Sequence, residues 1–208
     1  MINLNYFNFF SSPLGIFYFF ASAVVSICVF AVFLAVLIDF VEFDKRRQIK
    51  KEKRSIVATG SMFLFFFFIY YLIRFKIGYF EIENLPIKVS LIVVGLIILI
   101  FGCVINISGR LSLGKNWSNQ IKIYNDHSFI FGGAYRLVRH PLYASIIWMV
   151  FAASIVFSNY LAFLFNSIFF VPFMYYRAKQ EEELLVKEFK QYKEYQQKVG
   201  MFFPKIKI

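Results

Sequence analysis

Residues 127–143 read HSFIFGGAYRLVRHPLY, and this polar stretch stands between long apolar runs. It contains both histidines of the chain, His127 and His140, together with paired glycines, two arginines and two tyrosines. It ends in a His-Pro pair at the start of another apolar run, where proline is well placed to begin a helix. We therefore expect the stretch to lie where a loop meets an apolar helix.

The apolar runs around this stretch indicate the class of the protein. Of the 208 residues, 60% are hydrophobic, and thirty are phenylalanine, whereas soluble domains are about 45–50% apolar. The excess is arranged in runs of roughly 15 to 25 residues with almost no charge, which is typical of membrane-spanning helices. The sequence predicts an all-α integral membrane protein with about five transmembrane helices.

The same runs predict where the helices lie. Three spans and the two arms of a helical hairpin are expected over residues 14–38, 56–73, 87–107, 142–157 and 161–176. Gly95 and Gly102 allow close helix contact in the third span, and Pro172 should bend the second arm of the hairpin. Apolar residues then recur near helical spacing among polar ones, which predicts an amphipathic helix over residues 177–199.

The basic residues indicate the orientation in the membrane. The net charge is +11, and the Lys and Arg residues crowd into residues 44–54, DKRRQIKKEKR, and residues 108–139. Cytoplasmic segments of membrane proteins carry such an excess of Lys and Arg. This pattern predicts a multi-pass protein with its N-terminus outside, a turn at residues 158–159 outside, and both polar segments and the C-terminus in the cytoplasm.

Two other kinds of partner are disfavoured. Nucleic-acid binding is not needed to explain the positive charge, because the basic residues flank apolar runs. Cys28 and Cys103 lie inside apolar runs, and their number and spacing indicate no metal site. No charged residue falls deep within the expected spans, which disfavours a transporter.

A second polar cluster follows the hairpin. Arg177 and Glu181 are four residues apart and share a helix face, and Glu182 and Glu183 come next. A surface ion pair and an ordinary membrane boundary are the simplest interpretations of this cluster and of residues 139–143. A charge at the end of a span that faces a bundle interior is instead a candidate for function. We expect the two polar clusters to meet.

The order and spacing of these motifs resemble the isoprenylcysteine carboxyl methyltransferases, part of a wider membrane group that includes phospholipid N-methyltransferases. The resemblance covers about residues 110–204, with the pattern Q-x6-HSFIFGGAY-x3-RHPLY, then R-x3-EE, then F-x2-Y-x2-Y-x3-V-x4-P. The chain departs from the family pattern at Ser145, where glycine is common, and at Lys190, where an F-G pair is usual. The first three spans match only in being apolar.

The resemblance implies S-adenosyl-L-methionine as cofactor and a lipidic or prenylated acceptor from the membrane. It implies a cofactor site made by Gln120, His127, Ser128, Phe129, Ile130, Tyr135, His140, Pro141, Leu142, Tyr143 and Glu181. Arg177 matches the position linked to the substrate carboxylate, and it is the candidate catalytic residue. Residues 1–107 would then form a three-span membrane region, and residues 108–208 one integrated unit with the cofactor-binding loop, the hairpin and the last helix.

Other functions remain open at this point. The acceptor could be a carboxylate, an amine or a thiol, and an amine acceptor would make the protein a phospholipid N-methyltransferase. Sterol reductases that use NADPH share a similar R-H-P-x-Y region, although they are usually longer. A non-catalytic membrane protein would bind no cofactor. A soluble Rossmann-type methyltransferase is excluded, because no strand pattern and no G-x-G-x-x-G motif occurs.

Overall fold

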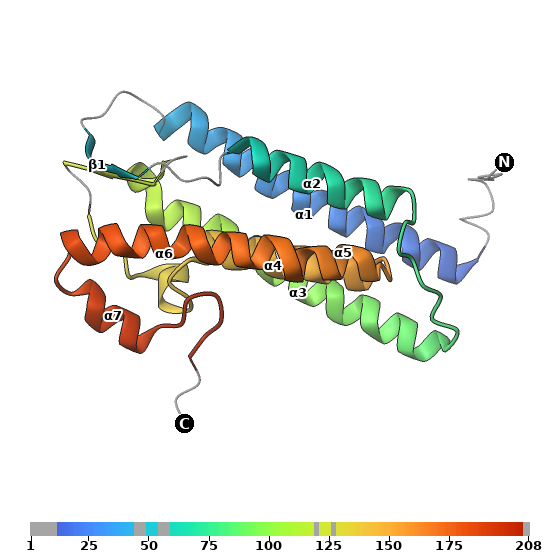
Figure 1. Cartoon of the computed structure of the whole chain (residues 1–208). Helices are drawn as coiled ribbons and strands as arrows, with labels where there is room; N and C mark the ends of the chain where they lie inside the picture. The colour runs from blue at the N-terminus through green and yellow to red at the C-terminus, as the bar shows by residue number, and fades with distance from the viewer. Residues whose placement is uncertain (1–11, 44–48, 54–58, 119–120, 126–127, 206–208) are drawn as a thin grey trace.

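The computed structural model describes residues 12–43, 49–53, 59–118, 121–125 and 128–205. Long helices lie side by side in a bundle, and short elements gather at one end of it (Figure 1). In chain order the elements are α1 (Pro13–Phe43), β1 (Ile49–Lys53), α2 (Thr59–Arg74), α3 (Leu85–Leu113), η2 (Gly114–Asn116), β2 (Ile121–Tyr124), η3 (Gly133–Arg136), α4 (Pro141–Val156), α5 (Tyr160–Phe165), the π-helical η4 (Asn166–Phe170), α6 (Val171–Glu188) and α7 (Tyr192–Lys198).

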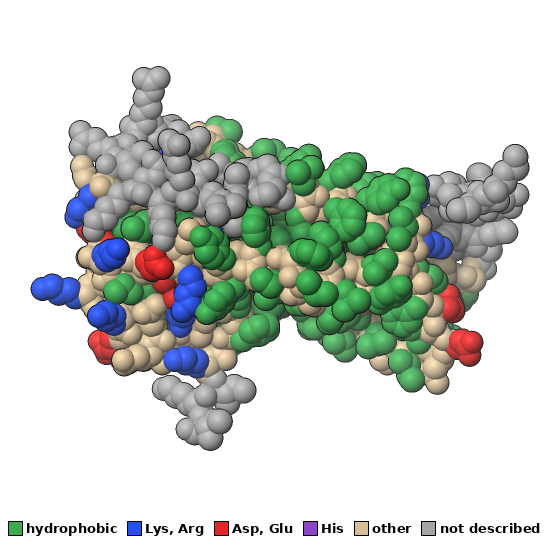
Figure 2. Space-filling model, viewed as in Figure 1, with side chains coloured by type: hydrophobic (Ala, Val, Ile, Leu, Met, Phe, Trp, Pro, Cys, Tyr) green, Lys and Arg blue, Asp and Glu red, His purple; other side chains and the backbone are tan. Residues whose placement is uncertain are grey.

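The apolar helices agree with a multi-pass membrane protein. Three helical stretches, Pro13–Glu42, Leu85–Asn116 and Tyr160–Glu188, are long and apolar enough to cross a membrane. Met62–Arg74 and Pro141–Val156 are apolar but shorter. Figure 2 shows a broad band of hydrophobic side chains between two charged ends, as expected for a surface in contact with lipid. The five expected apolar helices are therefore present, and three of them have the length of a full span.

The second arm of the hairpin differs from the prediction. It continues past Tyr176 as one helical rod through α5, η4 and α6 and ends at Glu188, and α7 is separate and short. The prediction of a single amphipathic helix over residues 177–199 is therefore wrong. The second arm of the hairpin continues without a break to Glu188, and α7 begins only at Tyr192. The π-helical turn ends just before Pro172, which has no N–H for the regular α-helical pattern.

A small sheet is the second difference. β1 pairs antiparallel with β2, with Glu52 opposite Lys122. The sheet lies against α6, and Lys50 forms an ion pair with Glu188 at the end of that helix. The expectation of no strands is wrong here, because the pairing joins two loops about seventy residues apart and leaves no periodic pattern in the sequence.

Close packing of α3 on α4 forms the centre of the bundle. Gly95, Gly102 and Gly109 are seven residues apart and face α4. A Cβ atom at Gly102 would lie 2.7 Å from the Cγ atom of Met149 and 3.1 Å from the backbone oxygen of Ser145. The predicted role of Gly95 and Gly102 in close helix contact is confirmed.

Polar side chains connect three helices beside this glycine face. Arg110 pairs with Asp39 of α1 and donates to the Oδ1 atom of Asn106 at 2.8 Å. Asn106 donates to the hydroxyl of Ser145 on α4 at 2.8 Å. Asp39 and Arg110 are both buried, and they lie where α1 and α3 extend beyond the expected spans. Each charge is tolerated because it is paired.

Each end of the bundle is joined by short backbone pairings. At one end Tyr79 pairs with Asn159, so the loop after α2 meets the turn between α4 and α5. At the other end, where the β1–β2 sheet also lies (Figure 1), Val138 pairs with Gly200. Both polar clusters therefore lie at the same end of the bundle, as the predicted topology requires.

Gly102→Ala should lower the free energy of unfolding by about 1–3 kcal/mol, because the added methyl group overpacks the contact between α3 and α4. Thermal unfolding in detergent measures the effect. Gly132→Ala is the matched control, since nothing lies within 4 Å of a Cβ atom built there. Equal unfolding midpoints for the two variants would contradict the close contact.

Candidate functional site

The polar stretch is held in place by the chain that follows α7. The backbone N–H of Arg139 donates to the oxygen of Gly200 at 2.8 Å, and that of His140 donates to the oxygen of Met201 at 3.2 Å. Pro141 then opens α4, as the sequence predicts. The His-Pro pair is therefore fixed between the start of a membrane helix and the end of the described chain.

His140 lies between two neighbouring carboxylates of α6. Its Nδ1 atom is 3.6 Å from the Oε2 atom of Glu181, and its Nε2 atom is 3.2 Å from the Oε1 atom of Glu182. Burial by itself would lower the pKa of His140, but hydrogen bonds and charge attraction from the two glutamates outweigh it and raise the pKa above 6.5. The imidazolium form can therefore bridge both carboxylates.

Glu182 is an anchor for α7. Only 3% of its side chain is exposed, and it accepts hydrogen bonds from the Nε atom of Arg139 at 2.7 Å and from the amide of Gln196 at 2.8 Å. Arg139 also donates to the backbone oxygens of Gln196, at 3.1 Å, and of Val199. This buried pair fixes α7 against α6.

Glu181 faces the other way and shares Tyr143 with Arg177. The hydroxyl of Tyr143 donates to Glu181 at 3.0 Å and accepts from the Nε atom of Arg177 at 2.9 Å. The rings of Tyr143 and His140 stack at 5.5 Å. Arg177 is buried, although it stands at the end of an apolar stretch. Arg177 and Glu181 of α6 are thus linked through the side chain of Tyr143 on α4.

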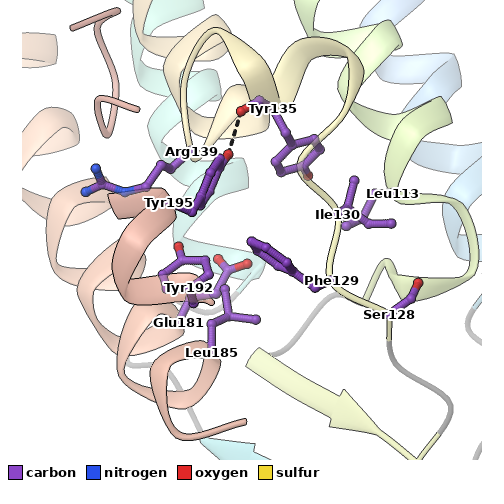
Figure 3. A pocket seen from close by; sticks show the side chains of 10 residues that line it. All are labelled: Leu113, Ser128, Phe129, Ile130, Tyr135, Arg139, Glu181, Leu185, Tyr192 and Tyr195. Carbon is purple, nitrogen blue, oxygen red and sulfur yellow. Dashed lines mark hydrogen bonds between the residues drawn. The ribbon is translucent and has the colours of Figure 1, made fainter. Parts of the chain in front are cut away.

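A cavity opens between the loop before η3 and the two helices α6 and α7 (Figure 3). It encloses about 400 Å³ of empty space, part of which is open to solvent. Its lining comprises Leu113, Ser128, Phe129, Ile130, Tyr135, Arg139, Glu181, Leu185, Tyr192 and Tyr195. The lining thus brings together side chains from α3, the loop before η3, α6 and α7.

Aromatic rings form much of this lining. Phe129 stacks on Phe189 at 5.7 Å and meets Tyr192 and Tyr195 edge to face at 5.8 and 5.4 Å. The hydroxyl of Tyr195 donates to the backbone oxygen of Tyr135 at 2.5 Å, which ties η3 to α7. Burial and the charge of Glu181 raise the pKa of Tyr135, so its hydroxyl stays neutral at physiological pH. Aromatic faces beside a carboxylate favour a cationic ligand.

The loop that carries Ser128 and Phe129 is held by η2, and η3 packs closely on α3. Asn116 donates to the hydroxyl of Ser128 at 2.9 Å and accepts from its backbone N–H at 3.3 Å. Gly133 has a φ of +57°, and a Cβ atom there would lie 2.6 Å from the hydroxyl oxygen of Ser112. Glycine is required at this position, because the backbone is left-handed and the approach to α3 is too close for a side chain.

The predicted site residues fall into groups. Lining the cavity are Ser128, Phe129, Ile130, Tyr135 and Glu181. His140 and Tyr143 are not part of the lining but contact Glu181, and Arg177 is connected to Glu181 through the hydroxyl of Tyr143. Pro141 and Leu142 lie outside this lining and pack against Gly109 of α3. Gln120 and His127 lie outside the described residues.

Sequence reasoning missed the part of the lining that comes from α7. Tyr192 and Tyr195 are three residues apart and share one helix face, so a common environment was readable from their spacing. Arg139, Leu185 and Leu113 also line the cavity. Their contribution depends on contacts between distant segments, which no local pattern reveals.

Comparison with known proteins gives a consistent result. Residues 93–187 match the isoprenylcysteine carboxyl methyltransferase (ICMT) family model. Two rice proteins, from Oryza sativa subsp. indica and subsp. japonica, are both named "Probable protein-S-isoprenylcysteine O-methyltransferase". Each is 33% identical over 115 residues, which covers 53% of this chain and 60% of the relative. The chain thus aligns with about three fifths of the length of these relatives.

A solved structure shares the fold. It is described as the eukaryotic intramembrane Ras methyltransferase ICMT without a monobody, and it is 23% identical. The match covers 72% of this chain and 54% of that chain, with a TM-score of 0.56. At this identity the likeness bears on the fold alone. The family model and the curated relatives together show that part of this chain, centred on residues 93–187, is similar to the isoprenylcysteine carboxyl methyltransferase family.

Proposed function

We propose that this protein transfers a methyl group from S-adenosylmethionine to the carboxylate of a prenylated cysteine or a closely related lipidic acid. The observation that carries the proposal is the placement of Arg177 and Glu181, which lie one helical turn apart and share the hydroxyl of Tyr143. The family relationship supports the same reaction class. The active site would face the cytoplasm, as the basic segments at this end of the bundle suggest.

The lining of the cavity suits a sulfonium cofactor. Glu181 supplies a carboxylate for a cationic group, while Phe129, Tyr135 and Tyr195 supply aromatic faces. Ser128 and the backbone of its loop offer donors and acceptors to polar parts of a nucleoside. S-adenosylmethionine, when bound, supplies an activated methyl group, so the residues around it need to bind and align rather than activate it.

Arg177 suits the acceptor. An ionised carboxylate is already a nucleophile and needs orientation by a cation, whereas an ammonium group would first need a base. The guanidinium is buried beside Tyr143 at the end of an apolar stretch, where a lipidic acid can bring its charged end. In this role Arg177 aligns the acceptor oxygen with the methyl group of the donor.

A labelled methyl transfer assay tests the function. Purified protein receives S-adenosylmethionine with a radiolabelled methyl group and either N-acetyl-S-farnesylcysteine or phosphatidylethanolamine. The proposal expects label on the farnesylcysteine that is released by mild alkali, because a methyl ester is base-labile and an N-methyl group is not. Alkali-stable label on phosphatidylethanolamine would point to the N-methyltransferase, and no transfer to either acceptor would count against both.

Glu181→Gln should weaken S-adenosylmethionine binding about tenfold, which corresponds to about 1.4 kcal/mol, because the cavity loses its carboxylate. Isothermal titration calorimetry in detergent measures the affinity. Glu183→Gln is the matched control, since Glu183 is exposed on the same helix. Equal affinities for the two variants would remove Glu181 from the cofactor site.

Arg177→Ala should lower the rate of methyl transfer about a hundredfold or more, while cofactor affinity changes little. The reason is that the guanidinium orients the acceptor. Lys179→Ala removes a neighbouring exposed cation and should retain the wild-type rate. A normal rate in the Arg177 variant would refute the acceptor role.

The ion pairs of His140 should make stability depend on pH. The pKa of His140 is raised in the folded protein, so its contribution is complete below pH 6.5 and is lost as pH rises through the raised pKa. The difference in unfolding midpoint between wild type and His140→Gln should therefore shrink between about pH 6 and pH 9. Parallel midpoint curves over that range would show that His140 does not titrate as a bridging cation.

A further inference from the structure

Tyr192 lines the cavity, and its buried hydroxyl has no hydrogen-bond partner among the described residues. Only 2% of Tyr192 is exposed. Buried polar atoms are almost always paired, and leaving a hydroxyl unpaired is costly. Tyr195 on the same helix provides the contrast, because its hydroxyl donates to the backbone oxygen of Tyr135.

The ring of Tyr192 is held where it is. It meets Phe129 edge to face at 5.8 Å and Tyr195 at 5.6 Å. The helix that carries it is tied to α6 through Gln196 and Glu182. The hydroxyl therefore cannot turn toward solvent without moving α7, and a partner has to come to it.

The charges nearby indicate what that partner is. Figure 3 shows the Tyr192 ring beside the Glu181 carboxylate. Burial, together with the charges of Glu182 and Glu181, raises the pKa of Tyr192, so the hydroxyl keeps its proton and can both donate and accept. A carboxylate and a neutral hydroxyl side by side suit an amino-acid group, whose ammonium pairs with the first and whose polar atoms reach the second.

We propose that Tyr192 is a further ligand-binding residue, whose hydroxyl hydrogen-bonds the amino-acid end of the methyl donor beside Glu181. The inference rests on the proposed function and adds a residue to its site. In this arrangement α7 contributes directly to ligand binding, because the hydroxyl of Tyr192 contacts the ligand while the hydroxyl of Tyr195 holds η3.

Tyr192→Phe tests the assignment with two ligands measured by calorimetry in detergent. S-adenosylhomocysteine carries the amino-acid end, and 5′-methylthioadenosine has the same nucleoside and sulfur without it. The variant should bind S-adenosylhomocysteine about tenfold more weakly, as the loss of one buried hydrogen bond to a charged group implies. Its affinity for 5′-methylthioadenosine should stay within about twofold of wild type.

Two controls separate recognition from folding. Tyr160→Phe makes the same chemical change at an exposed residue in α5, toward the other end of the bundle, and should leave both affinities unchanged. Without ligand, Tyr192→Phe should keep or raise the unfolding midpoint, because it removes an unpaired buried hydroxyl. A fall of several degrees would reveal an internal partner and overturn the assignment.

The remaining outcomes are distinct. An unchanged affinity for S-adenosylhomocysteine in the Tyr192 variant would overturn this inference while the proposed function stands. Equal losses for both ligands would overturn the contact with the amino-acid end. A wild-type protein that binds neither S-adenosylhomocysteine nor S-adenosylmethionine would refute the proposed function and this inference together.

Discussion

The buried pair between Arg139 and Glu182 is the interaction on which the site depends. Each charge would be unstable in this setting alone, since the penalty for removing an ion from water exceeds what one imperfect contact returns. Here Glu182 also accepts from His140 and Gln196, and Arg139 also donates to backbone oxygens near the end of α7. The donors come from segments before α4 and after α6. One carboxylate thus brings together the parts that surround the cavity.

The neighbouring glutamates of α6 have separate tasks because of helix geometry. Residues one position apart in an α-helix point about 100° away from each other. Glu182 therefore faces the buried junction with α7, while Glu181 faces the cavity and Tyr143. His140 contacts both carboxylates and so connects the buried Glu182, which holds α7, to Glu181, which lines the cavity.

Much of this arrangement was readable from the sequence, and the exceptions share a cause. Apolar runs locate the membrane helices, and Arg177 and Glu181 lie near the polar stretch as their motifs predict. Ser145, where the family commonly has glycine, fits because Asn106 donates to its hydroxyl. The β1–β2 sheet and the cavity wall from α7 were missed, because each depends on pairing between remote segments and has no local period. The spacing of apolar residues in a sequence predicts which face of a helix or strand is buried, but it does not identify the segment that packs against that face.

The pairing of Val138 with Gly200 has a consequence for biosynthesis. About sixty residues separate the two, and both arms of the hairpin lie between them. The ribosome must therefore deliver α4, α5 and α6 into the bilayer before the cavity can close. Until then Arg139 and Glu182 lack their common neighbours near the end of α7, and a half-inserted chain exposes unpaired charge at the membrane surface.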